Sequence, residues 1–221
     1  MDVRLLVVIT ENSWLFTGLN DLLPEMTCLK LGYDTQNLPH EVKNARNIIV
    51  AVDSLIIFRG EWITFNKLRA YREDISVVWL TQEHTGRIFP ARSRGDMILS
   101  QTQDIASFCH SIREIAEHSS VCRINADRVI PVSLTLTEHR LLPFFTAGVS
   151  LSVLSRQLGC AIKTLYHHRN SIVTKAGFRQ PAFLEYVYHC NPGFSGLFSP
   201  ESDLRKKTWQ EEQIKSVCLE G

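Results

Sequence analysis

The segment 162–176 has the spacing of a helix with one polar and one apolar face. Its polar face recurs at positions i, i+3, i+4, i+7 and i+11 and holds Lys163, Tyr166, His167, Asn170 and Thr174. Its apolar face recurs near the 3.6-residue period and holds Leu165, Ile172, Val173 and Ala176. Such a helix packs on a domain through its apolar side and can present hydrogen-bonding groups to the major groove of double-stranded DNA.

A first helix of the same domain is predicted over residues 135–147. Thr135 and Glu138 have the spacing of a capping box, which is typical of a helix start. Pro143 lies inside this helix and removes a backbone donor, so we expect it to kink or loosen the helix.

A second helix and the segment 162–176 together form a helix-turn-helix pattern. Ser150 is expected to cap the second helix, and the tight turn 159–161 ends it. The residues that we expect to point inward are Val153, Leu154 and Leu158. In this pattern the second of the two helices reads bases. A fourth helix is predicted over residues 181–189.

Charge is distributed unevenly along the chain, although its overall value is only +1. Residues 1–120 carry 12 Lys or Arg against 15 Asp or Glu. Residues 134–185 carry six Lys or Arg against two Glu, a net charge of +4. Positive charge therefore gathers on the segment with the helix-turn-helix pattern, where phosphates would be met.

The first two-thirds of the chain alternate apolar runs with helical patterns. Strands are predicted at residues 3–9, 48–52, 75–80 and 97–99, with an edge strand at 27–31. Helical patterns lie between them at residues 13–23, 61–71 and 104–117. This alternation predicts an α/β domain with a doubly wound parallel sheet, whose chemistry lies at the carboxyl ends of the strands.

The ungapped pattern over residues 134–182 resembles the DNA-binding domain of the LuxR/GerE (NarL/FixJ) family of bacterial transcription regulators. The matching positions are Leu134, Thr135, Glu138, Leu141, Leu142, Gly148, Val149, Ser150, Leu158, Lys163, Thr164, Leu165, His168, Ile172, Lys175 and Gly177. The pattern departs at Ala161, where Ser or Thr usually caps the recognition helix, at Ala176, where Leu is usual, and at Pro143. The resemblance implies an all-α helix-turn-helix domain.

The resemblance also implies a role for individual residues. Tyr166, His167 and Asn170 occupy the base-contacting positions. The residues placed for the DNA backbone are Lys163, Thr164, Arg169 and Lys175. His168 is expected to pack against the scaffold. Because the last helix commonly forms the dimer contact, Leu184, Val187 and Tyr188 are either interface residues or core residues.

The alternating strands and helices ahead of this domain resemble a response-regulator receiver. Asp53 then occupies the phosphoacceptor position after the third strand, and Thr81 follows the fourth. Glu11 is one carboxylate where two are expected for magnesium, and Ser100-Gln101 replaces the expected Lys. We therefore expect a degenerate receiver, a pseudo-receiver that is regulated without phosphorylation, in which Asp53 is a polar residue at a solvent-facing strand end.

The sequence divides into four predicted regions. They are a receiver-like domain (1–118), a linker (119–133), a LuxR-type DNA-binding domain (134–190) and a C-terminal tail (191–221) that either docks or is disordered. The chain has no apolar run of membrane-spanning length and no signal-type N-terminus, so we expect a cytoplasmic protein without membrane contact. Six widely spaced cysteines and no catalytic signature predict no metal, no cofactor and no enzymatic activity.

The favoured interpretation is a sequence-specific DNA-binding transcription regulator. We expect it to act without phosphorylation, as a homodimer or as a heterodimer with a related regulator. Two alternatives remain open. In one, Asp53 is a working phosphoacceptor. In the other, the protein has lost strong DNA binding and titrates a related regulator, which Pro143 and the missing cap at Ala161 favour.

Overall fold

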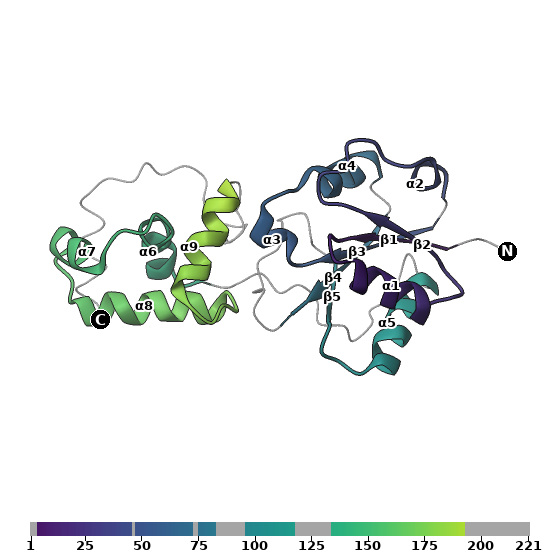
Figure 1. The fold of residues 1–221 in the computed structure, drawn as a ribbon. Coiled ribbons are helices and arrows are strands. Elements are labelled where there is room, and N and C mark those ends of the chain that lie inside the picture. Colours follow the sequence, from purple (N-terminus) through teal and green to yellow (C-terminus); the bar gives the residue numbers. More distant parts are fainter. Residues whose placement is uncertain (1–3, 46, 73–74, 83–95, 118–133, 193–221) are drawn as a thin grey trace. The chain divides into compact units, whose positions relative to one another are not determined.

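The computed structural model describes residues 4–45, 47–72, 75–82, 96–117 and 134–192 (Figure 1). These residues fall into two compact units, one before and one after the segment 118–133. The predicted linker and nearly all of the predicted tail lie outside the described residues. Within the described ranges, no helix has the length and apolar character needed to cross a bilayer.

The N-terminal unit is built on a parallel sheet of five strands. The strands are β1 (Leu5–Ile9), β2 (Thr27–Leu31), β3 (Ile48–Asp53), β4 (Ser76–Thr81) and β5 (Met97–Ser100). Their order is β2-β1-β3-β4-β5, and every neighbouring pair is parallel. This is a doubly wound order in which the direction of winding reverses between β1 and β3, so the predicted α/β sheet is confirmed.

Five helices are described in this unit, four between strands and α5 after β5. They are α1 (Ser13–Leu22), α2 (His40–Asn44), α3 (Ile56–Arg59), α4 (Ile63–Tyr71) and α5 (Ile105–Glu117). The sequence predicted α1, α4 and α5 but not α2 and α3. These two are five and four residues long, too short for a helical period to stand out.

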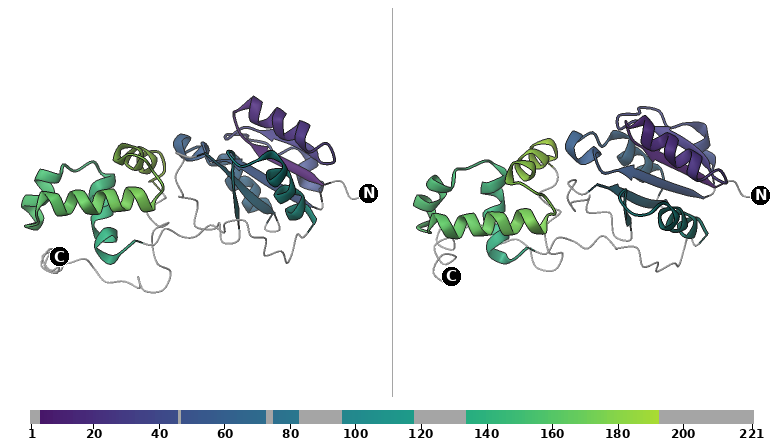
Figure 2. Two further views of the ribbon diagram at one scale, coloured as in Figure 1. Left: turned by 90° about the horizontal axis from the view of Figure 1, so that it is seen from below. Right: turned by 60° about the horizontal axis from the view of Figure 1, so that its bottom comes forward.

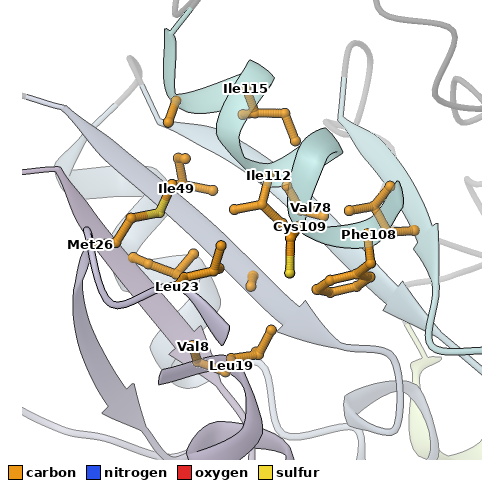
Figure 3. Close-up of a cluster of buried hydrophobic side chains, with 14 of the residues drawn as sticks. Val8, Leu19, Leu23, Met26, Ile49, Val78, Phe108, Cys109, Ile112 and Ile115 are labelled. Atoms are coloured by element: carbon orange, nitrogen blue, oxygen red, sulfur yellow. The ribbon is translucent and has the colours of Figure 1, made fainter. Parts of the chain in front are cut away.

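Helices cover both faces of the sheet. One face packs against α1 and α5, where Leu19 and Ile112, together with Leu23 just after α1, meet strand residues such as Val8 and Ile49 (Figure 3). The core on this side is wholly apolar, and its members are nearly excluded from solvent. The side chain of Trp79 on β4 belongs to the other face, where α4 covers it.

An aromatic cluster joins α4 to the sheet. The ring centroids of Phe65 and Trp79 are 5.3 Å apart, and the ring of Trp62 lies 5.8 Å from that of Phe65. The indole Nε1 of Trp79 donates to Asp96 Oδ2 at 3.1 Å, which satisfies the polar atom of this buried side chain. These contacts link α4, β4 and the start of β5.

The C-terminal unit is helical. Its helices are α6 (Leu136–Thr146), α7 (Leu151–Leu158), α8 (Ile162–Lys175) and α9 (Pro181–Cys190). The bounds of α6, α8 and α9 lie within one residue of those predicted. α8 is the longest of them and contacts the other three (Figure 2). α6 continues as one α-helix through Pro143, which lies in its last turn.

Candidate nucleic-acid interface and the carboxyl edge of the sheet

The start of α6 is fixed by the predicted capping box. The amide of Glu138 donates to Thr135 Oγ1 at 3.2 Å, and the amide of Thr135 donates to Glu138 Oε2 at 2.7 Å. Glu138 is only 2% exposed, so its carboxylate needs further partners inside the unit.

Two residues of α8 supply those partners. The hydroxyl of Ser171 donates to Glu138 Oε1 at 2.6 Å, and the ammonium of Lys175 donates to Glu138 Oε2 at 2.6 Å. Burial acts to raise the pKa of Glu138, but the hydrogen bonds from Lys175 and Ser171 outweigh it and lower the pKa to about 2. Glu138 therefore ties α6 to the second half of α8. The charge of Lys175 is balanced within the unit, and its predicted phosphate contact stays a prediction.

The ends of α7 and the start of α8 follow the predicted signals in part. Ser150 caps α7 by accepting a hydrogen bond from the amide of Val153 at 3.4 Å. Gly159 ends α7 with a φ of 65°, the left-handed region that a glycine adopts without steric cost. Ala161 begins α8 and provides no side-chain cap, as its residue type predicted.

One core prediction on α7 is wrong. Leu154 and Leu158 are buried as expected, but Val153 is 38% exposed. Leu154 and Leu158 are four residues apart and share a helix face, whereas Val153 is rotated about 100° from Leu154. Val153 therefore lies beside the core rather than in it.

The exposed side of α8 carries the residues predicted to face DNA. Tyr166 is 51% exposed, Lys163, His167 and Thr174 are also exposed, and Asn170 is half-buried. The apolar side carries Leu165, Ile172, Val173 and Ala176, all buried. The structure thus brings the three predicted base-contacting residues onto one accessible face of one helix.

The remaining α8 residues predicted to contact the DNA backbone are less exposed. Thr164 is half-buried near the start of the helix, and its amide donates to Ala161 O at 3.0 Å. Arg169 is also half-buried, and its Cζ lies 5.5 Å from the ring centroid of Tyr166. Their phosphate contacts stay predictions.

His168 is half-buried, as expected of a scaffold residue, and burial lowers the pKa of its imidazole. Its ring centroid lies 6.1 Å from that of His167 at an interplanar angle of 62°. Within the described part of the chain, no group of three or more His, Cys, Asp or Glu side chains could hold a metal ion.

On α9, two of the three candidate interface residues belong to the core. Leu184 is 1% exposed and Val187 is fully buried within the single chain, so their interpretation as interface residues is corrected to core packing. Tyr188 is partly buried, which raises the pKa of its phenol. Tyr186, which the sequence analysis did not single out, is 51% exposed. The buried stripe of Leu184 and Val187 (i, i+3) predicts that Tyr186 lies away from the core.

In the N-terminal unit, Asp53 is completely buried at the end of β3. The hydroxyl of Thr10 donates to Asp53 Oδ2 at 2.7 Å, and the amide of Leu55 donates to Asp53 Oδ1 at 3.1 Å. The expectation of a solvent-facing carboxylate is therefore wrong. Asp53 is covered by Thr10, which follows β1, and both carboxylate oxygens of Asp53 accept hydrogen bonds from the protein.

Glu11 follows β1 and contacts the segment after β2. Its Oε1 accepts a hydrogen bond from the amide of Tyr33 at 3.0 Å. A Cβ at Gly32 would lie 2.7 Å from the same oxygen, so Glu11 occupies the space that a larger residue at position 32 would need. The phenol of Tyr33 is buried, and burial together with the charge of Asp53 raises its pKa. Asp34 is also near Glu11, but among the described residues no group of three or more acidic, His or Cys side chains is arranged to hold a magnesium ion.

The ends of β4 and β5 also pair with each other. The hydroxyl of Thr81 donates to Leu99 O at 3.4 Å. At the place where the receiver pattern has Lys, the side-chain amide of Gln101 donates to Leu80 O at 3.2 Å and accepts from Gln82 Nε2 at 3.2 Å. These neutral contacts provide no cation for a phosphoryl group.

The chain was compared with known proteins. No family model and no curated protein sequence matches it. A solved structure of two RcsB dimers bound to two parallel DNAs matches with a TM-score of 0.61 at 14% identity, over 85% of this chain and 98% of that chain. The chain shares the fold of RcsB.

Two further solved structures agree. RcsB from Salmonella enterica serovar Typhimurium bound to promoter rprA matches with a TM-score of 0.60 at 14% identity, over 83% of this chain and 97% of that chain. The complex of the two-component response regulator RcsB with DNA matches with a TM-score of 0.58 at 14% identity, over 85% and 98%. The predicted fold, a receiver-like α/β unit followed by a helix-turn-helix unit, is confirmed.

Proposed function

We propose that this protein is a sequence-specific DNA-binding transcriptional regulator that reads double-stranded DNA with the exposed face of α8. One observation carries the proposal: Tyr166, His167 and Asn170 share an accessible face of the second helix of a helix-turn-helix unit. Asn can pair with adenine through two hydrogen bonds, and Tyr and His can donate to acceptors on base edges. The likeness in fold to RcsB, which has been solved bound to DNA, supports this use of the helix.

The charge of the unit supports the same function. Residues 134–185 carry a net charge of +4, and Lys163 is exposed in the first turn of α8, next to the base-contacting face. Lysine at this position can contact a phosphate and fix the register of the helix without reading sequence. Binding should therefore weaken steeply as salt is raised.

We further propose that the protein binds DNA as a homodimer or as a heterodimer with a related regulator. RcsB has been solved as dimers on DNA, which supports a dimer for a chain of the same fold. On α9, the exposed Tyr186 and His189 are better placed for a partner than Leu184 and Val187, which fill the core. A symmetric dimer would require two half-sites about one helical turn apart.

The proposed regulation does not involve phosphorylation of Asp53. Three features support this part. Asp53 is fully buried with both oxygens hydrogen-bonded, Glu11 is held at the amide of Tyr33, and Gln101 stands in neutral contacts where a cation is required. A phosphodonor would have to displace Thr10 to reach Asp53 Oδ2, and the described residues offer no group of three or more metal-binding side chains to assist it.

DNA binding is tested by selecting ligands from random-sequence double-stranded DNA with the purified full chain at low salt. We expect an enriched sequence that the wild type binds in a mobility-shift assay. Asn170→Ala should bind this sequence no better than unrelated DNA. As a matched control, Asn20→Ala alters an exposed Asn of α1 in the other unit and should leave the shift unchanged. Failure of the wild type to enrich any sequence would refute the proposal.

Phosphorylation is tested by incubating the full chain with acetyl phosphate and magnesium and measuring its intact mass. We expect no mass increase of one phosphoryl group. An increase that is absent in Asp53→Asn would show that Asp53 is a working phosphoacceptor and would overturn this part of the proposal.

A further inference from the structure

The side chain of Arg169 lies against the ring of Tyr166, which is one turn closer to the start of α8. Its Cζ is 5.5 Å from the ring centroid, within the range of a cation–π contact. Helix residues three apart are neighbours, and side chains lean toward the N-terminus of the helix. The spacing of these two residues therefore places the guanidinium over the tyrosine.

The surroundings of Arg169 fit support of the ring better than contact with a phosphate. Its Nε is buried and has no hydrogen-bond partner among the described residues, whereas the neighbouring Tyr166 is 51% exposed. An arginine that binds phosphate offers its planar fork of donors outward. The buried Nε of Arg169 is not placed to take part in such a fork.

An exposed tyrosine that reads a base has to be ordered when DNA binds. Ordering a side chain with free rotamers lowers affinity, and holding it in place beforehand removes part of that loss. The ring of Tyr166 projects from the accessible face of α8, and among the described residues Arg169 provides the one cation–π contact to it.

We propose that Arg169 is a positioning residue that orders Tyr166 for base contact, rather than a phosphate contact. The assignment rests on the proposed DNA-binding function. It predicts that Arg169 contributes to the preference for one sequence and not to the general attraction to DNA. A phosphate contact would have the opposite effect, because phosphates are the same in every sequence.

The experiment measures binding of the full chain to its selected DNA and to unrelated DNA of equal length over a series of salt concentrations. Arg169→Gln should lower the ratio of the two affinities about threefold, as expected for loss of one exposed cation–π contact. The slope of affinity against salt should stay unchanged. In a Tyr166→Ala background, Arg169→Gln should cause no further loss of preference. Lys163→Gln serves as the reference for a phosphate contact and should lower the salt slope by about 1.

Two results would overturn the assignment while leaving the proposed function intact. One is a lower salt slope for Arg169→Gln with an unchanged preference for the selected DNA. The other is an equal loss of preference with and without the Tyr166 ring. A wild-type chain that prefers no sequence would refute the proposed function together with this assignment.

A second measurement needs no DNA. The full chain is labelled with carbon-13 tyrosine and its NMR spectra are compared without DNA. In Arg169→Gln, the ring resonances of Tyr166 should shift from their wild-type positions, and its side chain should average over several rotamers. Unchanged Tyr166 signals would refute the positioning role on their own.

Discussion

Replacing Glu138 by Gln should loosen the attachment of α8 to the C-terminal unit. The carboxylate of Glu138 receives hydrogen bonds from Thr135 at the start of α6 and from Ser171 and Lys175 on α8. Gln keeps the shape and can still accept one hydrogen bond, but it removes the negative charge that Lys175 faces. The helix that carries the base-contacting residues then loses its charged link to α6.

The size of the effect follows from the pKa of Glu138. It is about 2, against 4.5 for an ordinary Glu. Because one pH unit corresponds to about 1.4 kcal/mol, the network stabilises the folded unit by roughly 3 kcal/mol at neutral pH. Lys175 is 35% exposed, so solvent screens part of this interaction. We expect Glu138→Gln to cost about 2 kcal/mol, typical of a charge-assisted hydrogen bond.

The dependence on pH has a definite sign. The pKa of Glu138 is lower in the folded than in the unfolded chain, so its contribution is fully present above pH 4.5. It is lost as the pH falls from 4.5 toward 2. The wild type should therefore lose more stability over this range than Glu138→Gln.

The assay is hydrogen exchange of α8 amides in the full chain, followed by mass spectrometry. A loss of about 2 kcal/mol corresponds to roughly thirtyfold faster exchange in this helix. Glu185→Gln removes the same charge from the same unit and should leave α8 exchange unchanged. Equal α8 protection in the wild type and Glu138→Gln, at pH 7 and across the acidic range, would refute the reasoning.

Two further substitutions test the packing of the helical unit. Pro143→Ala restores an N–H that can donate to the carbonyl of His139, so α6 should become more stable by about 1–3 kcal/mol. The unit should then melt at a higher temperature. A lower melting temperature would show that the ring of Pro143 is needed for packing. Leu184→Ala removes a side chain that is 1% exposed, so it should destabilise the unit by about 2–5 kcal/mol. If instead it only shifts the monomer–dimer equilibrium in sedimentation, with an unchanged melting temperature, Leu184 is an interface residue after all.

The sequence predicted the helical unit well because its local signals agree with one another. Thr135 and Glu138 form the expected capping box, Ser150 caps α7, and the two faces of α8 separate as their spacing predicts. The sequence did not reveal that Lys175 pairs with Glu138, since the two are 37 positions apart and come together only in the packed unit. The contact between Arg169 and Tyr166 could be foreseen from their spacing of three residues on one helix. The partial burial of Arg169 could not, because it depends on the packed unit.

The sheet was predicted from its apolar strands, while its polar edge was predicted only in part. The missing Lys and the single carboxylate were visible in the sequence, and they suggested a degenerate site. The burial of Asp53 was not visible, because it depends on Thr10 reaching across from the end of β1 to that of β3. The direction of Glu11 depends likewise on the amide of Tyr33, which follows β2.

The most direct test of the central claim is a double-mutant cycle that combines changes on α8 with changes in the major groove of the selected DNA, with binding affinity as the readout. Each purine of the selected site is replaced in turn by its 7-deaza analogue, which removes an acceptor found only in the major groove. For one or more positions, we expect the analogue to weaken wild-type binding about tenfold and to weaken Asn170→Ala or Tyr166→Ala much less. If every position tolerates the analogue, or if the losses are equal in the wild type and both variants, the exposed face of α8 does not read DNA.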